Sequence, residues 1–180
     1  EIIIATTRPE LICTCGMVIF NPKDKRYSDL NGKTAVTPIF GKEVKIKANS
    51  FASPEKGTGI AMMCSAGDLS DIQFFREQNL KPVIAINANG TMNENAGILK
   101  DMKVRDARKK MVEILKEKGL IVKQENIVHR TPISERSGTE AEFIEMPEFY
   151  VKQMEFKDEI KGIAKKIKFY PEESRKILFD

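Results

Sequence analysis

The chain has 180 residues, of which 41% are hydrophobic, and a formal net charge of +4. This length predicts one domain with a small appendage, and the apolar fraction suffices for a sizeable core. The composition excludes a disordered chain, and no apolar run reaches the roughly 18 to 20 residues of a membrane-spanning helix, so we expect no membrane partner. The mild basicity fits a polyanionic partner but is also common among soluble proteins.

The cysteines and the single histidine give little sign of a metal or redox site. Cys13, Cys15 and Cys64 form an odd, low set without a C-x-x-C pair, so we expect small buried side chains, no zinc and a reducing cytoplasm. His129 is interpreted as a surface or structural residue rather than a general base. The chain begins with Glu1 inside an apolar run, which we interpret as a piece of a longer protein.

Apolar runs and turn residues predict that the first hundred residues are mainly strands and turns. Asn21 and Pro22 form a turn signal, and Val44, Ile46 and Ala48 alternate with lysines as in a half-buried strand. The predicted strands cover residues 1–6, 11–20, the two halves of a hairpin at 33–51, 60–64 and 82–86.

Helical periodicity predicts helices over residues 68–79 and 103–118, and a short basic helix within 157–169. Gly119 suits the C-cap of the second helix. Most lysines and arginines of that helix fall on one face, which we interpret as solvated rather than RNA-binding. Its apolar residues recur at helical spacing: Val104, Ala107, Met111, Ile114 and Leu115.

Two polar clusters follow apolar runs. In ATTRPE, Pro9 forces extended backbone at Arg8, whose guanidinium would serve either a ligand or an internal ion pair with Glu10 or an aspartate. In GDLSD, Asp68 and Asp71 lie on one face at the start of a predicted helix. An N-cap at Asp68 and a favourable helix dipole at Asp71 would explain both acids, so spacing alone leaves function open.

Common nucleotide-binding and hydrolase motifs are absent from the sequence. The stretch GTG at residues 57–59 lacks the spacing of a phosphate-binding loop, and neither G-x-G-x-x-G nor G-x-S-x-G occurs. A single histidine leaves little room for a Ser-His-Asp triad.

Six stretches in order resemble the editing domain inserted in class I aminoacyl-tRNA synthetases. They are ATTRPE, GTG before an apolar run, CSAGDLSD, NGTMNENAG, ARKKMVEILKEKGLIVK and ERSGTEAEF. Each motif alone is weak, whereas the ordered set over nearly the whole chain is specific. The pattern is most similar to valyl enzymes of the archaeal type, with leucyl and isoleucyl enzymes as alternatives. Lys56, Met62, Cys64 and Gly67 differ from residues common at these positions in other members.

The resemblance implies an α/β fold, with a β-rich, barrel-like mixed sheet and peripheral helices. It places an editing domain at 1–144 and a connection returning to the catalytic domain at 145–180. The implied reaction is hydrolysis of the aminoacyl ester of mischarged tRNA, with Thr-tRNA(Val) as the expected substrate. The implied partners are the tRNA 3′ end and the remainder of the synthetase; editing needs no cofactor or metal, and ATP binding belongs to the full-length enzyme. A non-catalytic module that binds the tRNA acceptor end is the competing hypothesis.

The same resemblance implies roles for individual residues, because in the family the two polar clusters meet at one pocket. Asp71 would anchor the α-ammonium group of the substrate, and Asp68 would accept from the threonine hydroxyl or order a water. Thr6 and Thr7 would place hydroxyls and backbone N–H groups near the ester carbonyl. The expected substrate-binding residues are Arg8, which would hold the phosphate or sugar of the terminal nucleotide, and Lys56, Gly57, Thr58, Gly59, Met62 and Cys64.

Overall fold

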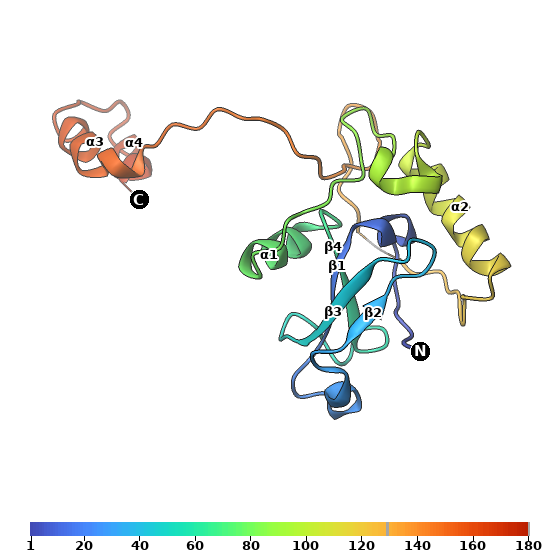
Figure 1. Ribbon diagram of the computed structural model, residues 1–180. Coiled ribbons are helices and arrows are strands. Elements are labelled where there is room, and N and C mark those ends of the chain that lie inside the picture. Colours follow the sequence, from blue (N-terminus) through green and yellow to red (C-terminus); the bar gives the residue numbers. More distant parts are fainter. Residues whose placement is uncertain (129, 180) are drawn as a thin grey trace. The chain divides into compact units, whose positions relative to one another are not determined.

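The computed structural model describes residues 1–128 and 130–179, which form two compact units, Glu1–Glu145 and Met146–Asp180. The first unit contains a sheet with helices around it, and the second contains short helices only (Figure 1). The predicted surface role of His129 lies outside the described residues. The assignment of residues 1–144 to an editing domain stays a prediction.

The sheet has four strands in the order β2-β3-β1-β4. Strand β1 pairs in parallel with β3 and antiparallel with β4, and β2 and β3 form the predicted hairpin. This mixed sheet with peripheral helices confirms the α/β class, although the four strands do not close into a barrel. The strands are β1 (Cys15–Phe20), β2 (Thr34–Val36), β3 (Glu43–Ala48) and β4 (Ile60–Cys64).

Two α-helices of the first unit confirm the predicted helical segments. Helix α1 spans Leu69–Glu77 and α2 spans Val104–Glu117, within two residues of the predicted ends. Gly119 follows α2 with φ +66°, a left-handed conformation that glycine adopts without strain. Three 3₁₀-helices complete the unit: η1 (Pro9–Thr14), η2 (Lys25–Leu30) and η3 (Glu94–Leu99).

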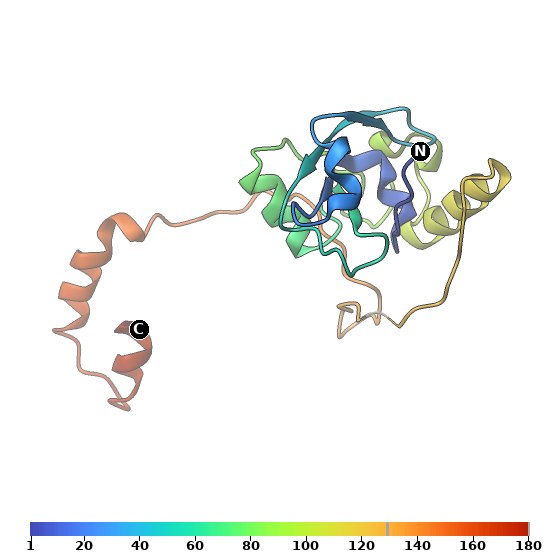
Figure 2. The same ribbon diagram turned by 90° about the horizontal axis from the view of Figure 1, so that it is seen from below.

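The sheet is covered by apolar side chains on both faces. On one face, Phe74 and Phe75 of α1 pack with Met17 and Ile19 of β1. On the other face, β1 contributes Val18 and Phe20 to a larger core shared with α2. Helices α1 and α2 therefore lie on opposite sides of the sheet, as the two views show (Figures 1 and 2). The apolar residues of α2 in this core are Val104, Ala107, Met111 and Leu115.

Two strand predictions near apolar runs are wrong, and the strand predicted at 11–20 begins only at Cys15. Residues 1–6 form no strand, and residues 9–14 form the 3₁₀-helix η1, so Cys13 does not share a strand with Cys15. Pro9 at the first position of η1 has no N–H to offer a ladder and has the backbone angle that suits a helix start. Residues 82–86 are partly buried but form only one bridge, from Ile86 to Met92.

The second unit contains the predicted basic helix and several exposed apolar side chains. It is built from η4 (Met154–Phe156), α3 (Lys157–Ala164) and α4 (Ser174–Phe179). Ala164 is buried within it, whereas Ile163 is 62% and Tyr170 is 77% exposed. Across the described stretches 1–128 and 130–179, no helix is both long and apolar enough to cross a membrane.

Candidate functional site

The start of α1 places the two predicted aspartates side by side. Asp68 is the N-cap, and its Oδ1 accepts hydrogen bonds from the backbone N–H of Asp71 at 2.8 Å and from the Ser70 hydroxyl at 2.6 Å. Asp68 is exposed and Asp71 is half-buried. The capping role predicted for Asp68 is therefore confirmed, and Asp71 stands in the first turn, where the helix dipole favours an anion.

The carboxyl group of Asp71 folds back over Gly67. A Cβ atom at Gly67 would collide with Oδ2 of Asp71, so the missing side chain leaves the space that this carboxyl occupies. Burial raises the pKa of Asp71 from its ordinary value near 3.8 to about 7, with a further contribution from the negative charge of Asp68. The charge of Arg8 opposes this rise in pKa. Asp71 therefore changes its charge near neutral pH.

This pKa predicts a pH-dependent stability. Because the pKa of Asp71 is about 7 when folded and near 3.8 ordinarily, the folded state binds the proton more tightly than the unfolded state. The stabilisation is fully present below about pH 4 and is lost as the pH rises through about 7. Urea unfolding across this window should show the wild type losing free energy of unfolding relative to Asp71→Asn, with Asp106→Asn as an exposed control. A constant difference between wild type and Asp71→Asn would contradict the shifted pKa.

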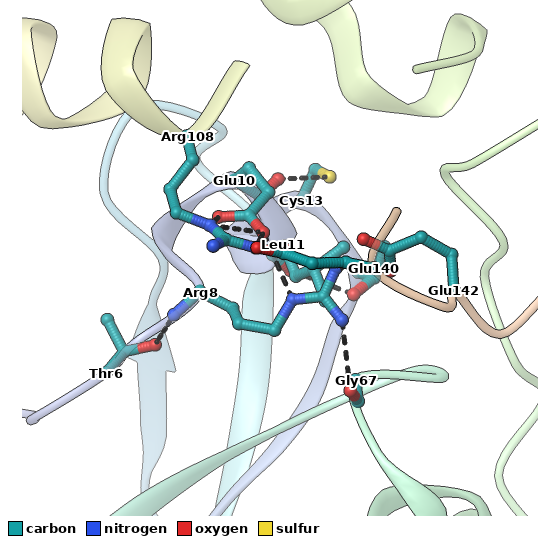
Figure 3. A network of polar contacts seen from close by, with 10 residues as sticks. Thr6, Arg8, Glu10, Leu11, Cys13, Gly67, Arg108, Glu140 and Glu142 are labelled. Carbon is teal, nitrogen blue, oxygen red and sulfur yellow. Dashed lines mark hydrogen bonds and ion pairs between the residues drawn. The ribbon is translucent and has the colours of Figure 1, made fainter. Parts of the chain in front are cut away.

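Arg8 connects the two polar clusters (Figure 3). Its Nη1 donates to the carbonyl of Gly67 at 3.1 Å, its Nη2 to Glu142 at 2.6 Å, and its Nε to Glu10 at 3.1 Å. Burial lowers the pKa of Arg8, but Glu142 and Glu10 outweigh this effect, so the pKa lies above its ordinary value. The internal pair with Glu10 is thus present, and a contact of Arg8 with a nucleotide stays a prediction.

Four charged residues of this network were not among the predicted site residues: Glu10, Arg108, Glu140 and Glu142. Glu10 is fully buried and also accepts hydrogen bonds from Arg108 of α2, which faces the site rather than joining the solvated face of that helix. Nη2 of Arg108 also lies 3.6 Å from Oε2 of Glu140. The only signal in the sequence was the Arg8–Glu10 spacing, since Arg108 and Glu142 are distant along the chain.

The segment before Arg8 passes beside the GTG stretch. Thr6 and Thr7 are exposed, and the Thr6 hydroxyl accepts from the backbone N–H of Arg8 at 3.1 Å. A Cβ atom at Gly57 would lie 2.8 Å from the Cβ of Ala5, and φ at Gly57 is +61°, so this close approach suits glycine alone. Residues 5–8, Gly57 and the start of α1 therefore gather in one region.

The other predicted binding residues differ in accessibility. Lys56 is exposed and Thr58 half-buried, whereas Gly59 is buried beside Arg26. Met62 is half-buried on β4. Cys64 is buried opposite Cys15, and the hydrogen bond between the thiols together with burial raises the pKa of Cys64. The substrate-binding roles of these residues stay predictions.

Metal ligands are not gathered in the part of the chain that the structure describes. Within residues 1–128 and 130–179, no group of three or more histidine, cysteine, aspartate or glutamate residues is arranged to hold a metal ion.

The chain is similar in sequence to known proteins along its whole length. No protein-family profile matches the chain. Over all 180 residues it is 43% identical to the valine–tRNA ligase of Aeropyrum pernix. It is 45% identical over 173 residues to that of Pyrococcus furiosus and 38% identical over 169 residues to that of Rickettsia rickettsii. These matches cover 100%, 94% and 93% of the chain but only 22%, 19% and 21% of the relatives, so it spans about a fifth of their length. Along its whole length, the chain is therefore homologous to a segment that makes up about a fifth of valine–tRNA ligases.

Proposed function

We propose that the chain is the editing domain of a valine–tRNA ligase and hydrolyses the aminoacyl ester of Thr-tRNA(Val). The observation that carries this proposal is the half-buried carboxyl group of Asp71, which lies over Gly67, the residue whose carbonyl accepts a hydrogen bond from Arg8. The similarity to valine–tRNA ligases supports the valyl assignment over the leucyl and isoleucyl alternatives. In this proposal, the remainder of the synthetase and the tRNA 3′ end are the partners.

A valine-selecting enzyme needs a second site because threonine is nearly isosteric with valine. A hydrophobic pocket rejects an added hydroxyl by only about 10², a general value established for this very pair of amino acids. A hydrolytic site that hydrogen-bonds the threonine hydroxyl selects in the opposite sense, since valine would leave its polar groups unpaired.

The residues at the start of α1 suit this task. The anionic form of Asp71 would anchor the α-ammonium group of the esterified amino acid by a charge-assisted hydrogen bond. Asp68 is exposed while it caps α1, so its carboxylate is accessible to the threonine hydroxyl or to a water. An ester is already activated, so a positioned water with donors from Thr6 and Thr7 near the carbonyl would suffice.

Deacylation of two esters tests the proposal. The chain should hydrolyse Thr-tRNA(Val) at least about 10² times faster than Val-tRNA(Val), because only threonine satisfies a polar pocket. The spontaneous rate of each ester is subtracted, and a complete valine–tRNA ligase containing this segment is assayed in parallel to supply tRNA contacts that the chain lacks. Equal rates for the two esters would refute the threonine specificity. Binding of tRNA without hydrolysis in both proteins would favour the non-catalytic module.

A further inference from the structure

Glu10 is a buried carboxylate held between two arginines from different parts of the chain. Its side chain has no exposed surface, whereas those of Arg8 and Arg108 are 21% and 30% exposed. Arg108 donates from Nε at 3.1 Å and from Nη2 at 3.0 Å to Oε1, and Nε also lies 3.2 Å from Oε2. Arg8 adds a bond from Nε at 3.1 Å. Glu10 therefore links η1 to α2 and holds the guanidinium group of Arg8 in place.

The fixed guanidinium of Arg8 in turn holds the loop that leads into α1. Its Nη1 donates to the carbonyl of Gly67, and the carboxyl group of Asp71 lies directly over the same glycine. A shift of Gly67 would therefore move the carboxyl group of Asp71. Figure 3 shows the continuous path from Arg108 through Glu10 and Arg8 to Gly67.

The charges of this cluster indicate that it serves the protein rather than an anionic ligand. Two positive guanidinium groups, Arg8 and Arg108, face three carboxylates, Glu10, Glu140 and Glu142. The formal balance is one negative charge, before Asp68 and Asp71 are counted. An environment of this sign favours a cationic group such as an α-ammonium and disfavours a phosphate.

We propose that Arg108 is a positioning residue that acts through Glu10 and Arg8 to hold Gly67, and with it the carboxyl group of Asp71, in place. The inference rests on the proposed function insofar as Asp71 anchors the substrate. Without Arg108, the buried Glu10 carboxylate keeps, among the residues that the structure describes, only the bond from Arg8. Because an under-bonded buried carboxylate is costly, Arg8 turns both of its donor edges toward Glu10 and releases the Gly67 carbonyl.

The variants Arg108→Gln and Arg108→Lys test this path, with Arg105→Gln as an exposed control on the same helix. The first readout is the pKa of Asp71, followed by carboxyl NMR titration, which requires no activity. The charged or titratable groups that act on Asp71 are Asp68, Arg8, Cys15 and Cys64. Of these, only Arg8 lowers the pKa through its charge, so its departure in Arg108→Gln raises the pKa of Asp71.

The second readout is steady-state deacylation of Thr-tRNA(Val) by the chain or by the complete ligase that contains it. A displaced Asp71 lowers kcat by about 10-fold. The acid limb of kcat/KM moves to higher pH together with the pKa of Asp71. Arg108→Lys gives intermediate values, because a lysine keeps the charge on Glu10 but cannot supply the two-pronged contact. Arg105→Gln matches the wild type.

The outcomes separate this inference from the proposed function. A folded Arg108→Gln protein with wild-type pKa of Asp71 and wild-type kcat overturns the positioning role. If Arg108→Gln does not fold, Arg108→Lys is the deciding variant. A wild-type pKa of Asp71 and a wild-type kcat in Arg108→Lys would overturn the positioning role and leave Arg108 with a purely structural one. A wild-type protein that hydrolyses no Thr-tRNA(Val) overturns the proposed function, while the pKa of Asp71 in the variants still tests the path from Arg108.

Discussion

Asp71→Asn should lower the hydrolysis of Thr-tRNA(Val) by about 10- to 150-fold. A charge-assisted hydrogen bond contributes roughly 1.5–3 kcal/mol, and loss of that contact in the transition state gives this range of rates. Asparagine has the same shape but carries no charge for the α-ammonium group. The measurement is kcat/KM for deacylation above about pH 7, where the wild-type carboxyl of Asp71 is ionised.

The control for this prediction is Asp68→Asn with melting temperatures for both variants. Asparagine caps a helix about as well as aspartate, and it still accepts from a hydroxyl, so Asp68→Asn should cost less activity. A helix-capping role alone predicts that Asp71→Asn keeps its full rate. A stable and fully active Asp71→Asn protein would remove Asp71 from the site and leave the aspartate pair as the start of a helix.

Glu10→Ala should lower the free energy of unfolding by about 3 kcal/mol, the lower end for breaking a buried ion pair. The change removes the carboxylate to which Arg8 and Arg108 both donate. The loss stays at the lower end because both guanidinium groups are partly exposed, so water can reach them. Urea unfolding at constant pH measures the effect.

An ion pair on the exposed face of α2 provides the matched control. Glu113 lies 3.3 Å from Lys110, and both side chains are largely in water. Glu113→Ala should therefore change the free energy of unfolding by less than about 0.5 kcal/mol. If Glu10→Ala lowers the free energy of unfolding by less than about 1 kcal/mol, water replaces the Glu10 carboxylate at little cost. That result would contradict the large loss expected for a buried ion pair.

Features of the fold that depend on neighbours along the chain were predictable. Asp68 bonds to an N–H three residues away, and the apolar spacing of α2 repeats within fourteen residues. The alternation of Val44 and Ile46 with lysines likewise predicted β3. These patterns carry their own periodicity, so no knowledge of the rest of the structure was needed.

The wrong strand predictions show that local patterns do not determine the structure of short apolar runs. A short apolar run is equally consistent with a strand, a buried 3₁₀-helix or an irregular segment, and only a partner strand decides between them. Residues 1–6 have the composition of a strand, yet no described strand pairs with them. The run after Pro9 is buried as predicted, but as η1.

The candidate site was predictable in part for the same reason. Motif order drew attention to Arg8, Gly57 and Asp71, which the structure brings into one region. The helical pattern placed most basic residues of α2 on a solvated face and gave no sign of the contact between Arg108 and Glu10, which spans 98 residues of sequence. Charge pairs at such separations are set by tertiary packing, and no local pattern encodes them.

Strand β1 sends Met17 and Ile19 into one core and Val18 and Phe20 into the other. Strand β1 is therefore shared by two packed layers. Neither α1 nor α2 can separate from the sheet without exposing one face of β1 to water. Loosening of α1 and loosening of α2 both expose β1, so the two layers belong to one cooperative unit. Asp71 on α1 and Arg108 on α2 therefore keep fixed positions relative to one another as long as both faces of β1 remain buried.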